Sequence, residues 1–456
     1  MTLAEIAGAI GGRAIGGSDT PVTSVVLDSR QVTPGALFVA LKGEHADGHD
    51  YVDDAVAAGA VGALVERSVA GPAVVVDDVV AALARLARVV VDKIDVEVVS
   101  VTGSCGKTTT KDLLAQVLDR DGPTIAPIGS YNNEIGFPLT VLRADESTRH
   151  LVLEASARGI GHIAYLCEIA PPKIGVVLNV GSAHLGVFGS RAAIAQAKGE
   201  LVEALPADGV AVLNADDQLV NAMHSRTRAR VVRFGTGEDA DVRGTDIVMH
   251  AGRASYTLVH RGETARVDLQ VYGEHNVANS LAVAAVALEV GMPLSDAAAA
   301  LSDARPVSRW RMEVNETSAG VTVINDAYNA NPESVVAGLR ALVELAGERR
   351  TWAVLGEMAE LGAEAPAAHE RVGRAVNELG VARLVAVGGS DVTEPRRAGA
   401  AATGSRVSVQ DAPDVEAAID LLRRALEPGD VVLVKASRAA GLERIATALL
   451  DAQVPA

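Results

Sequence analysis

The chain has few cysteines and no long apolar run. Two cysteines, Cys105 and Cys167, occur in 456 residues, which is too few for a disulfide framework and is typical of a reducing compartment. No apolar segment approaches the roughly 20 residues needed to span a bilayer. The first residues also lack the basic segment and long apolar segment of a secretory signal. We therefore expect a cytoplasmic protein that does not insert into membranes.

Positive charge and aromatic side chains are also scarce. The formal net charge of −17 repels a phosphate backbone, so nucleic acid is not an expected partner. Aromatic residues make up 3% of the chain and hydrophobic residues 49%, so the cores must consist of Ala, Val, Leu and Ile in helices and buried strands. Any bound polyphosphate must be held by local groups, such as helix N-termini, a few Lys or Arg side chains and divalent cations.

The length of the chain predicts about three domains, at roughly 100–200 residues per domain. Residues 1–95 show short strand patterns and one Ala-rich helix, which predicts a small α/β domain. In residues 96–305, apolar strands alternate with helical patterns, which predicts a parallel sheet covered by helices on both faces, with an antiparallel extension over residues 231–272. Residues 306–456 repeat the β/α alternation and predict a third, Rossmann-like domain.

A glycine-rich turn joins a β-branched run to a helical pattern in "VSVTGSCGKTTTKDLL". The turn ends in GK[ST] but has two residues between its glycines, where the usual P-loop has four. Its backbone N–H groups can converge on phosphate oxygens at a helix start, Lys107 can span two phosphates, and the Thr108 hydroxyl can ligate Mg²⁺. An ordinary strand–turn–helix joint is the alternative. The predicted nucleotide-binding residues here are Gly103, Ser104, Cys105, Gly106, Lys107, Thr108 and Thr109.

Several segments along the chain match, in order and spacing, the motifs of one family. They are "DSRQVTPGALFVALKGEHADGHDYV", "TGSCGKTTTK", "YNNEIGFPLT", "GSAHLGVFGS", "AKGELVEAL", "GEHNVANSLAV", "SRWRMEV" and "INDAYNANPESV". Together they resemble the Mur ligases over nearly the whole chain, and "DAYNANPES" favours the members that add a dipeptide. Cys105 stands where Asn or Ser is common in the family, and "EASARG" replaces a more usual run after Glu154.

The resemblance implies an ATP-dependent ligase in peptidoglycan precursor synthesis. ATP would phosphorylate the terminal carboxylate of a UDP-N-acetylmuramoyl tripeptide, and the amine of D-alanyl-D-alanine would attack the acyl phosphate. A monomer is expected. The enzyme that adds the third amino acid, a folylpolyglutamate synthase and a nucleotide-dependent switch remain alternatives, and a switch would hydrolyse nucleotide without a peptide acceptor.

The resemblance also implies that two Mg²⁺ ions assist the reaction. Glu154 ends the strand "LVLE", and His184 follows the next strand in "GSAHL". Lys198 matches a lysine that the family uses in N-carboxylated form, whose negative charge helps to hold the second ion. Taken alone, Glu154 and His184 would be surface or hydrogen-bonding residues and Lys198 a solvated helix lysine. The predicted metal ligands are Thr108, Glu154, His184 and Lys198, and the predicted catalytic residues are Lys107, Lys198 and His184.

Four residues outside the loop are implied to contact ATP. Asn276 and Asn279 lie three apart, on one helix face, where the resemblance puts them near the adenine; helix capping is the alternative. Arg309 and Asp326 would reach ATP from across a cleft, and a salt bridge between domains is the alternative.

The remaining implied residues bind substrate. Residues 1–95 would bind the UDP-sugar, and other positions would bind the peptide groups. The predicted UDP-sugar residues are Ser29, Arg30, Lys42, Gly48 and His49, and the other predicted substrate residues are Asn133, Arg158, Tyr328, Asn329, Ser437 and Arg438.

Overall fold

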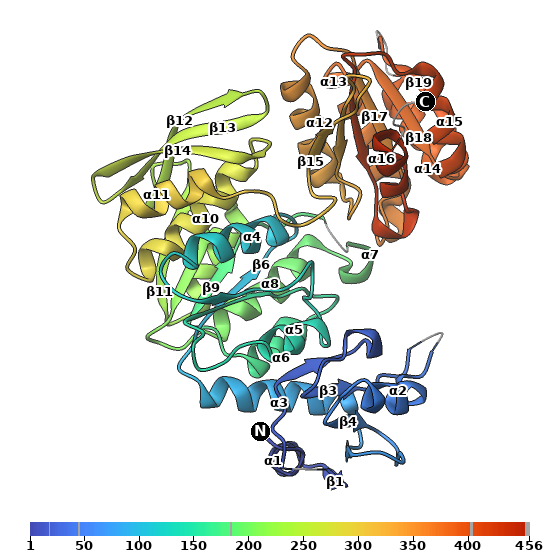
Figure 1. The fold of residues 1–456 in the computed structure, drawn as a ribbon. Coiled ribbons are helices and arrows are strands. Elements are labelled where there is room, and N and C mark those ends of the chain that lie inside the picture. The colour runs from blue at the N-terminus through green and yellow to red at the C-terminus, as the bar shows by residue number, and fades with distance from the viewer. Residues whose placement is uncertain (18, 44–45, 183–184, 402–404, 452–456) are drawn as a thin grey trace.

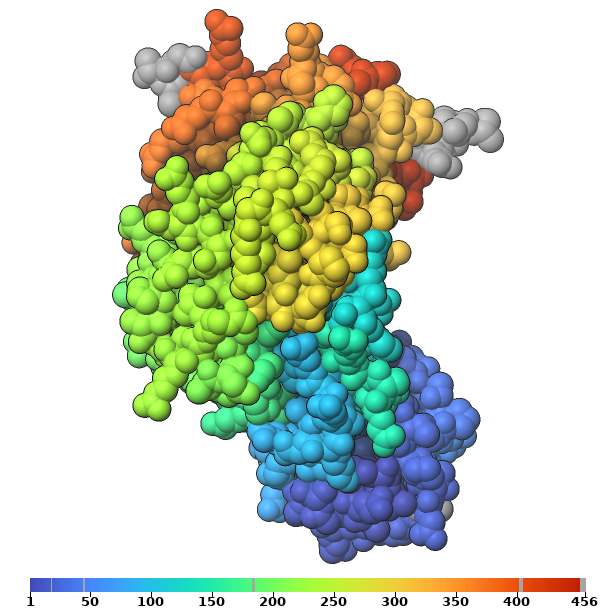
Figure 2. Space-filling model, turned by 90° about the vertical axis from the view of Figure 1, so that its left-hand side faces the viewer, coloured from blue at the N-terminus to red at the C-terminus, as the bar shows by residue number. Residues whose placement is uncertain are grey.

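The computed structural model describes residues 1–17, 19–43, 46–182, 185–401 and 405–451. It contains three sheets of five, nine and six strands, in chain order. The three parts follow one another along the molecule, with the N-terminal part at one end and the C-terminal part at the other (Figures 1 and 2). Within the described residues, no helix has the length and apolarity to cross a membrane.

The first sheet has the order β1-β5-β4-β3-β2, in which β2 to β5 pair in parallel and β1 is antiparallel to β5. The predicted strands and Ala-rich helix of this part are confirmed as β2 to β5 and α2. The elements are β1 (Arg13–Ile15), β2 (Ser24–Val26), β3 (Ala36–Val39), β4 (Gly62–Val65), β5 (Ala73–Val75), α1 (Leu3–Ile10), α2 (Val52–Ala57) and α3 (Val79–Lys93).

Sequence analysis missed α1 and α3. In α3, valines at both ends favour strand by local propensity. The helix nevertheless forms because Asp78 caps it, accepting a hydrogen bond from the backbone of Ala81, and because its apolar face buries Leu83 and Leu86. Helix α3 packs on α1 and also on α5 (Gly136–Val141) and α6 (His162–Ile169) of the next part, so it joins the first two parts of the molecule.

The second sheet has the order β14-β13-β12-β11-β10-β9-β6-β8-β7. Helices α4, α10 and α11 cover one face, and α5, α6 and α8 cover the other. The expected antiparallel extension is shorter than predicted, because β11 pairs in parallel with both neighbours. The strands are β6 (Glu97–Thr102), β7 (Thr124–Ile125), β8 (His150–Glu154), β9 (Ile174–Val177), β10 (Val210–Asn214), β11 (Arg230–Gly235), β12 (Val242–His250), β13 (Arg253–His260) and β14 (Glu263–Tyr272). The helices are α4 (Lys107–Leu118), α5 (Gly136–Val141), α6 (His162–Ile169), α7 (Leu185–Phe188), α8 (Arg191–Glu203), α9 (Gln218–Asn221), α10 (Asn276–Glu289) and α11 (Leu294–Asp303).

The third sheet has the order β15-β16-β20-β17-β18-β19. Its five strands β16, β20, β17, β18 and β19 pair in parallel, and the edge strand β15 is antiparallel to β16. This is the predicted Rossmann-like part. Its elements are β15 (Glu313–Glu316), β16 (Thr322–Asn325), β17 (Thr351–Leu355), β18 (Arg383–Val387), β19 (Ser408–Ala412), β20 (Val431–Lys435), α12 (Pro332–Ala346), α13 (Ala365–Glu378), α14 (Ser390–Ala400), α15 (Val415–Ala425) and α16 (Glu443–Leu450). The exact domain limits at 95 and 305 stay a prediction, and we call the three parts the N-terminal, central and C-terminal domains.

Candidate active site between the central and C-terminal domains

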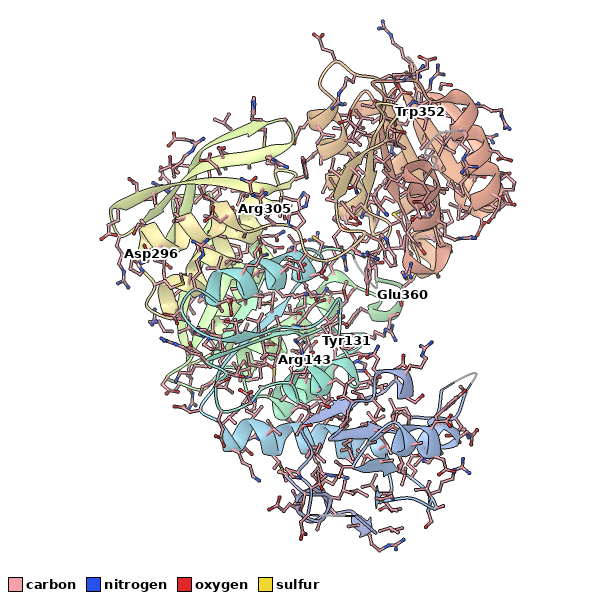
Figure 3. All side chains as sticks on the ribbon, in the orientation of Figure 1. Tyr131, Arg143, Asp296, Arg305, Trp352 and Glu360 are labelled. Carbon is pink, nitrogen blue, oxygen red and sulfur yellow. The ribbon has the colours of Figure 1, made fainter. Side chains whose placement is uncertain are left out.

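A cavity of about 1230 Å³ lies between the central and C-terminal domains. Arg305, on the link between these domains, and Glu360, on the C-terminal domain, both line it (Figure 3). The central domain contributes the glycine-rich turn and the ends of β6, β8 and β9, where the carboxyl ends of parallel strands meet at one edge. Such an edge is where open α/β sheets bind their ligands.

The glycine-rich turn connects β6 to α4 and leaves the helix start open. Gly106 has φ +83°, and a Cβ there would lie 2.4 Å from Oδ1 of Asn279. Both the backbone conformation and the close approach therefore require glycine. Within the described part of the chain, no side chain caps α4. Its first N–H groups thus stay available, and the helix dipole favours an anion beside them.

Asn179, which sequence analysis missed, holds this turn in place. Its Oδ1 accepts hydrogen bonds from the backbone N–H groups of Ser104 at 3.0 Å and Cys105 at 2.9 Å, and its Nδ2 donates to the carbonyl of Cys105 at 3.1 Å. Asn179 comes two residues after β9, which pairs with β6. The signal available from sequence was a polar residue directly after the buried run "IGVVL".

Lys107 is folded back across the turn. Its Nζ donates to the carbonyl of Gly103 at 2.7 Å. Burial lowers the pKa of Lys107, the charge of Glu154 raises it, and the charge of Arg311 lowers it again. A phosphate group beside the amine would favour its charged form.

Glu154 and Thr108 form a pair of oxygen donors at this helix start. The Thr108 hydroxyl donates to one Glu154 oxygen at 3.1 Å, and Asn132 donates to the other at 2.6 Å. Thr108 and Glu154 are both buried. A hydroxyl and a carboxylate are the hard oxygen ligands that Mg²⁺ prefers, so this pair fits that ion.

Of the four predicted metal ligands, Thr108, Glu154 and Lys198 lie within the described residues. His184 lies outside them, and among them no group of three His, Cys, Asp or Glu side chains could hold a metal ion. Lys198 lies in α8 and is 5% exposed, so the alternative of a solvated helix lysine is wrong. Burial lowers the pKa of Lys198 well below its ordinary value, Lys107 lowers it further, and Cys105 raises it.

A second helix start on the cavity wall, that of α6, is already occupied. The carboxylate of Glu200 accepts hydrogen bonds from the backbone N–H groups of Gly161 at 2.5 Å, Ile163 at 3.1 Å and Ala164 at 3.0 Å. A carboxylate in this position satisfies the free N–H groups of the helix. Of the two helix starts, that of α6 is filled by Glu200, and that of α4 is open to a phosphate.

The C-terminal domain reaches the turn through Arg311. Its guanidinium donates to the hydroxyl of Thr108 at 3.1 Å and of Ser130 at 3.3 Å, and lies 4.2 Å from the ring centre of Tyr328. The predicted residue, Arg309, is exposed and lies outside the set of described residues that line the cavity. Both arginines belong to "SRWRM", where the positive φ values of Trp310 and Met312 show an irregular turn. The spacing of residues in the sequence could not show which of the two arginine side chains this turn directs into the cavity.

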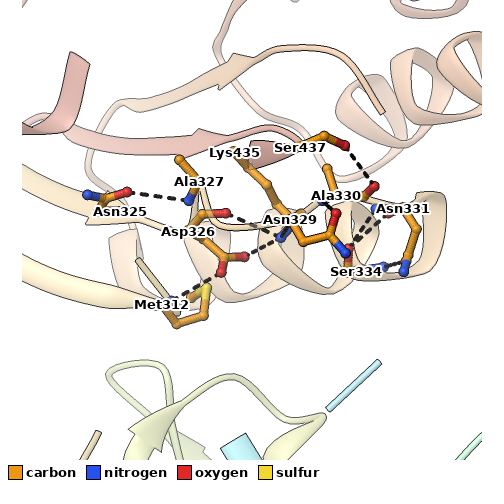
Figure 4. A network of polar contacts seen from close by, with 10 residues as sticks. All are labelled: Met312, Asn325, Asp326, Ala327, Asn329, Ala330, Asn331, Ser334, Lys435 and Ser437. Atoms are coloured by element: carbon orange, nitrogen blue, oxygen red, sulfur yellow. Dashed lines mark hydrogen bonds and ion pairs between the residues drawn. The ribbon is translucent and has the colours of Figure 1, made fainter. Parts of the chain in front are cut away.

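Asp326 and Lys435 form a buried ion pair on the C-terminal wall, at 2.5 Å (Figure 4). Asp326 also accepts from the backbone N–H of Met312 at 3.2 Å, and Lys435 donates to the carbonyl of Asn329 at 2.9 Å. The ion pair lies within one domain, so the alternative of an interdomain salt bridge at Asp326 is wrong. Lys435 ends β20, which pairs with β16, and Asp326 directly follows β16.

Three patterns of one family match this sequence. They are described as Mur ligase family, catalytic domain, over residues 21–100, Mur ligase middle domain over residues 101–287, and Mur ligase, glutamate ligase domain over residues 310–438. The UDP-N-acetylmuramoyl-tripeptide–D-alanyl-D-alanine ligase of Mycobacterium tuberculosis is 48% identical, over 99% of this chain and 98% of that protein. The chain belongs to the Mur ligase family. The Escherichia coli protein of the same name is 36% identical over the same shares of both chains.

Solved structures give the same result for the fold of this Mur ligase. A crystal structure of MurF from Acinetobacter baumannii has a TM-score of 0.89 and 30% identity, and the match covers 99% of this chain and 98% of that chain. The structure of MurF ligase from Thermotoga maritima in complex with ADP has a TM-score of 0.82 and 32% identity, covering 95% and 98%.

Asn276 and Asn279 line the cavity of this Mur ligase and are buried. Asn276 donates to the carbonyl of Tyr272 at 2.7 Å, and Asn279 donates to Oδ1 of Asn276 at 2.8 Å. The cap position of α10 belongs to His275, so neither asparagine is the capping residue. The close approach of Asn279 to Gly106 places this pair beside the start of α4.

The predicted substrate residues of the Mur ligase fall into two groups. The first group lines the cavity and comprises Asn133, Arg158, Tyr328, Asn329, Ser437 and Arg438. The second group lies in the N-terminal domain, outside the described cavity-lining residues, and comprises Ser29, Arg30, Lys42, Gly48 and His49. Both ring nitrogens of His49 are engaged locally: Nδ1 lies 2.6 Å from Asp47, and Nε2 accepts from the backbone of Glu66 at 3.0 Å. A role for this second group in binding the UDP-sugar stays a prediction.

Proposed function

We propose that this Mur ligase joins D-alanyl-D-alanine to a UDP-N-acetylmuramoyl tripeptide in peptidoglycan precursor synthesis, with conversion of ATP to ADP and phosphate. Relatives at 48% and 36% identity over nearly the whole chain bear the name of this activity. The structural observation that supports it is one cavity in which an open helix start of the central domain faces Arg311, Tyr328 and Asn329 of the C-terminal domain.

The chemistry requires activation of a carboxylate, because its charge and resonance resist attack by an amine. Transfer of the γ-phosphoryl group of ATP to a carboxylate oxygen gives an acyl phosphate and ADP. The amine of the dipeptide then attacks the carbonyl carbon, the bond to the phosphate oxygen breaks, and phosphate leaves as the amine loses a proton. The open N–H groups of α4, together with Lys107 and Arg311, would hold the transferring phosphoryl group and balance its charge.

Mg²⁺ fits the oxygen donors of Thr108 and Glu154, which would hold it beside the phosphates. When bound, the ion neutralises charge on phosphate oxygens. We include a second ion and His184 in the proposal on the strength of the family resemblance alone.

We also propose that Lys198 is N-carboxylated. The side chain is buried, and its nearby charges include the cation of Lys107, so a second cation there is unfavourable. Reaction of the neutral amine with CO₂ forms a C–N bond and releases one proton, which leaves a carbamate with a negative charge. That group would lie near Lys107 and balance its charge.

The remaining site residues have proposed substrate roles. Asn276 and Asn279 lie beside Gly106, where the rest of the nucleotide would extend from the phosphates. Arg438 stacks on Trp310 with its guanidinium carbon 4.1 Å from the ring centre, and Arg158 is an exposed cation on the central-domain wall. Both arginines are suited to substrate carboxylates.

The decisive experiment incubates the protein with ATP, Mg²⁺, D-alanyl-D-alanine and a UDP-muramoyl tripeptide with either diaminopimelate or lysine in third position. A product heavier by one dipeptide less water, with release of ADP that needs both substrates, supports the proposal. Steady ADP release without a peptide acceptor would instead indicate a nucleotide switch. Ligation of a single amino acid to a UDP-muramoyl dipeptide would indicate the enzyme that adds the third residue.

A further inference from the structure

Glu333, a carboxylate of the C-terminal domain that the chemistry above does not use, contacts the central domain. Glu333 is the second residue of α12, but the start of this helix is already capped by Asn331 and Ser334, which bond reciprocally at 2.9 and 3.0 Å. Glu333 instead accepts two hydrogen bonds from Ser182 of the central domain, from its backbone N–H at 3.1 Å and its hydroxyl at 2.8 Å. The side chain is therefore used across the domain interface and not within its own helix.

Ser182 belongs to the segment 178–182, which also holds the glycine-rich turn. Asn179 of this segment bonds the backbone of Ser104 and Cys105, as described above. The backbone N–H of Gly181 donates to the hydroxyl of Ser104 at 2.9 Å. A continuous series of hydrogen bonds thus runs from the turn, through 178–182, to α12.

Gly181 allows these groups to come close together. A Cβ at position 181 would lie 3.3 Å from both Cβ of Ser104 and Cδ of Glu333. These distances are tighter than ordinary van der Waals contact, so a larger residue would separate the turn from Glu333. The close approach of the turn and Glu333 at this interface therefore depends on the absence of a side chain at position 181.

We infer that Glu333 is a positioning residue that couples the placement of the C-terminal domain to the phosphate-binding turn through residues 178–182. This inference rests on the proposed function, because transfer and attack need groups of both domains at one place. A carboxylate that accepts two hydrogen bonds across the interface favours the arrangement in which Arg311 reaches Thr108.

The negative charge of Glu333 allows an experiment to distinguish a role in domain placement from a role in nucleotide binding. Burial raises the pKa of the Cys105 thiol, Lys107 lowers it, and Glu333 raises it, so the charge of Glu333 acts at the turn. A negative charge there disfavours phosphate binding. Removing Glu333 should therefore slow turnover without weakening ADP binding, a combination that a merely structural defect would not produce.

The experiment compares Glu333→Ala with Glu333→Gln and with the control Glu348→Ala. Glu348 is an exposed glutamate of the same domain, just after α12. We expect Glu333→Ala to lower kcat about tenfold, as loss of two charge-assisted hydrogen bonds from a domain equilibrium would, with the Kd for ADP unchanged or smaller. Glu333→Gln should recover part of the rate, because its amide oxygen can still accept from Ser182. Glu348→Ala should match the wild type.

Two further measurements identify the partner of Glu333. Ser182→Ala should also lower kcat, and the double variant should lose less than the product of the two single effects, because both changes break one contact. Small-angle scattering with ADP and the UDP-tripeptide should show a more extended average shape for Glu333→Ala than for the wild type.

Three results would overturn the inference: a Glu333→Ala rate within twofold of the wild type, effects of Glu333→Ala and Ser182→Ala that multiply, or a loss of ADP affinity as large as the loss of rate. Wild-type protein that binds ADP but does not ligate would instead refute the proposed function. Scattering and ADP binding would in that case still test the domain coupling.

Discussion

The two walls of the cavity are built in different ways. On the central-domain wall, the groups proposed to bind phosphate lie within seven consecutive residues, 103–109, and hydrogen bonds from the backbone of this turn to the side chain of Asn179 hold them. On the C-terminal wall, Arg311, Asp326 and Lys435 come from three distant segments, held by an ion pair and a cation–π contact. The groups of the first wall come from one domain, whereas Arg311 of the second wall reaches Thr108 across the interface between the domains.

The comparison predicts that changes in the central wall affect both binding and chemistry, while changes in the opposite wall affect chemistry more than nucleotide binding. The Lys107 and Arg311 variants test this difference. Two further predictions concern Lys198, which lies outside the described cavity-lining residues, and one buried histidine in each of the two domains.

The largest effect is expected for Lys107→Ala. It removes the amine that lies across the turn, and we expect a loss of roughly 10²- to 10³-fold in kcat, the range seen when a charge-stabilising donor is deleted, with weaker ADP binding. Initial rates and calorimetric ADP titration measure the two quantities. Lys93→Ala, at an exposed helix position, is the control. Near-normal ligation by Lys107→Ala would contradict the assignment of the phosphate-binding turn.

Lys198→Ala should follow, with a rate loss of roughly 100-fold and little change in ADP binding, because the proposed carbamate acts on charge balance at the reacting groups. A small carboxylic acid added to the assay should restore part of the rate. Lys173→Ala, which breaks a surface pair with Asp208, should behave like the wild type. Full activity of Lys198→Ala, or electron density that shows an unmodified amine at saturating bicarbonate, would contradict the carbamate.

Arg311→Ala tests the C-terminal wall. We expect about a tenfold fall in kcat/KM, from the loss of charge-assisted hydrogen bonds to Thr108 and Ser130, with ADP affinity changed less than in Lys107→Ala. Arg309→Ala is the matched control, since Arg309 is an exposed arginine two residues away. If Arg309→Ala were the slower variant, the position taken from the structure would be wrong.

The smallest effect concerns pH and again contrasts the two domains. In the C-terminal domain, burial and Arg396 lower the pKa of His369 to about 4, and its Nε2 accepts from the backbone of Met358 at 3.2 Å. A lowered pKa means that the neutral ring stabilises the fold above the unfolded pKa of about 6.5, and this contribution is lost as pH falls towards 4. In the central domain, burial lowers the pKa of His150, but Glu97 and Asp121 raise it more. Its contribution is present below the unfolded pKa and is lost as pH rises through the raised value.

We therefore expect His369→Gln to flatten the acid side of a plot of melting temperature against pH, and His150→Gln to flatten the alkaline side. Differential scanning calorimetry between pH 5 and pH 9, at fixed ionic strength, measures both. Equal flattening of the two sides by either variant would contradict the separate environments of these histidines.

Sequence analysis predicted the glycine-rich turn between β6 and α4 because its signals are local, and its role in binding phosphate stays a prediction. A buried strand, two glycines and a Lys-Thr pair stand next to one another, and Gly106 has the positive φ and the close neighbour that require glycine. The β/α alternation likewise predicted the two large sheets, because apolar runs of strand length report burial on both faces. Helix α3 was missed because its valines favour a strand locally. The helix is stabilised because it packs against elements of two domains.

The sequence by itself determined the three-part α/β organisation, the position of the turn and, through its motifs, the resemblance to the family. Tertiary structure decided which side chains complete the site. It placed Arg311 and not Arg309 at Thr108, Asn179 on the turn, and Lys198 in a buried position. It also filled the start of α6 with Glu200, which is about 40 residues away in the chain, and left the start of α4 open. The physical reason is that turn geometry and helix periodicity depend on neighbouring residues, whereas hydrogen bonds and charges in the site join segments that only the folded chain brings together.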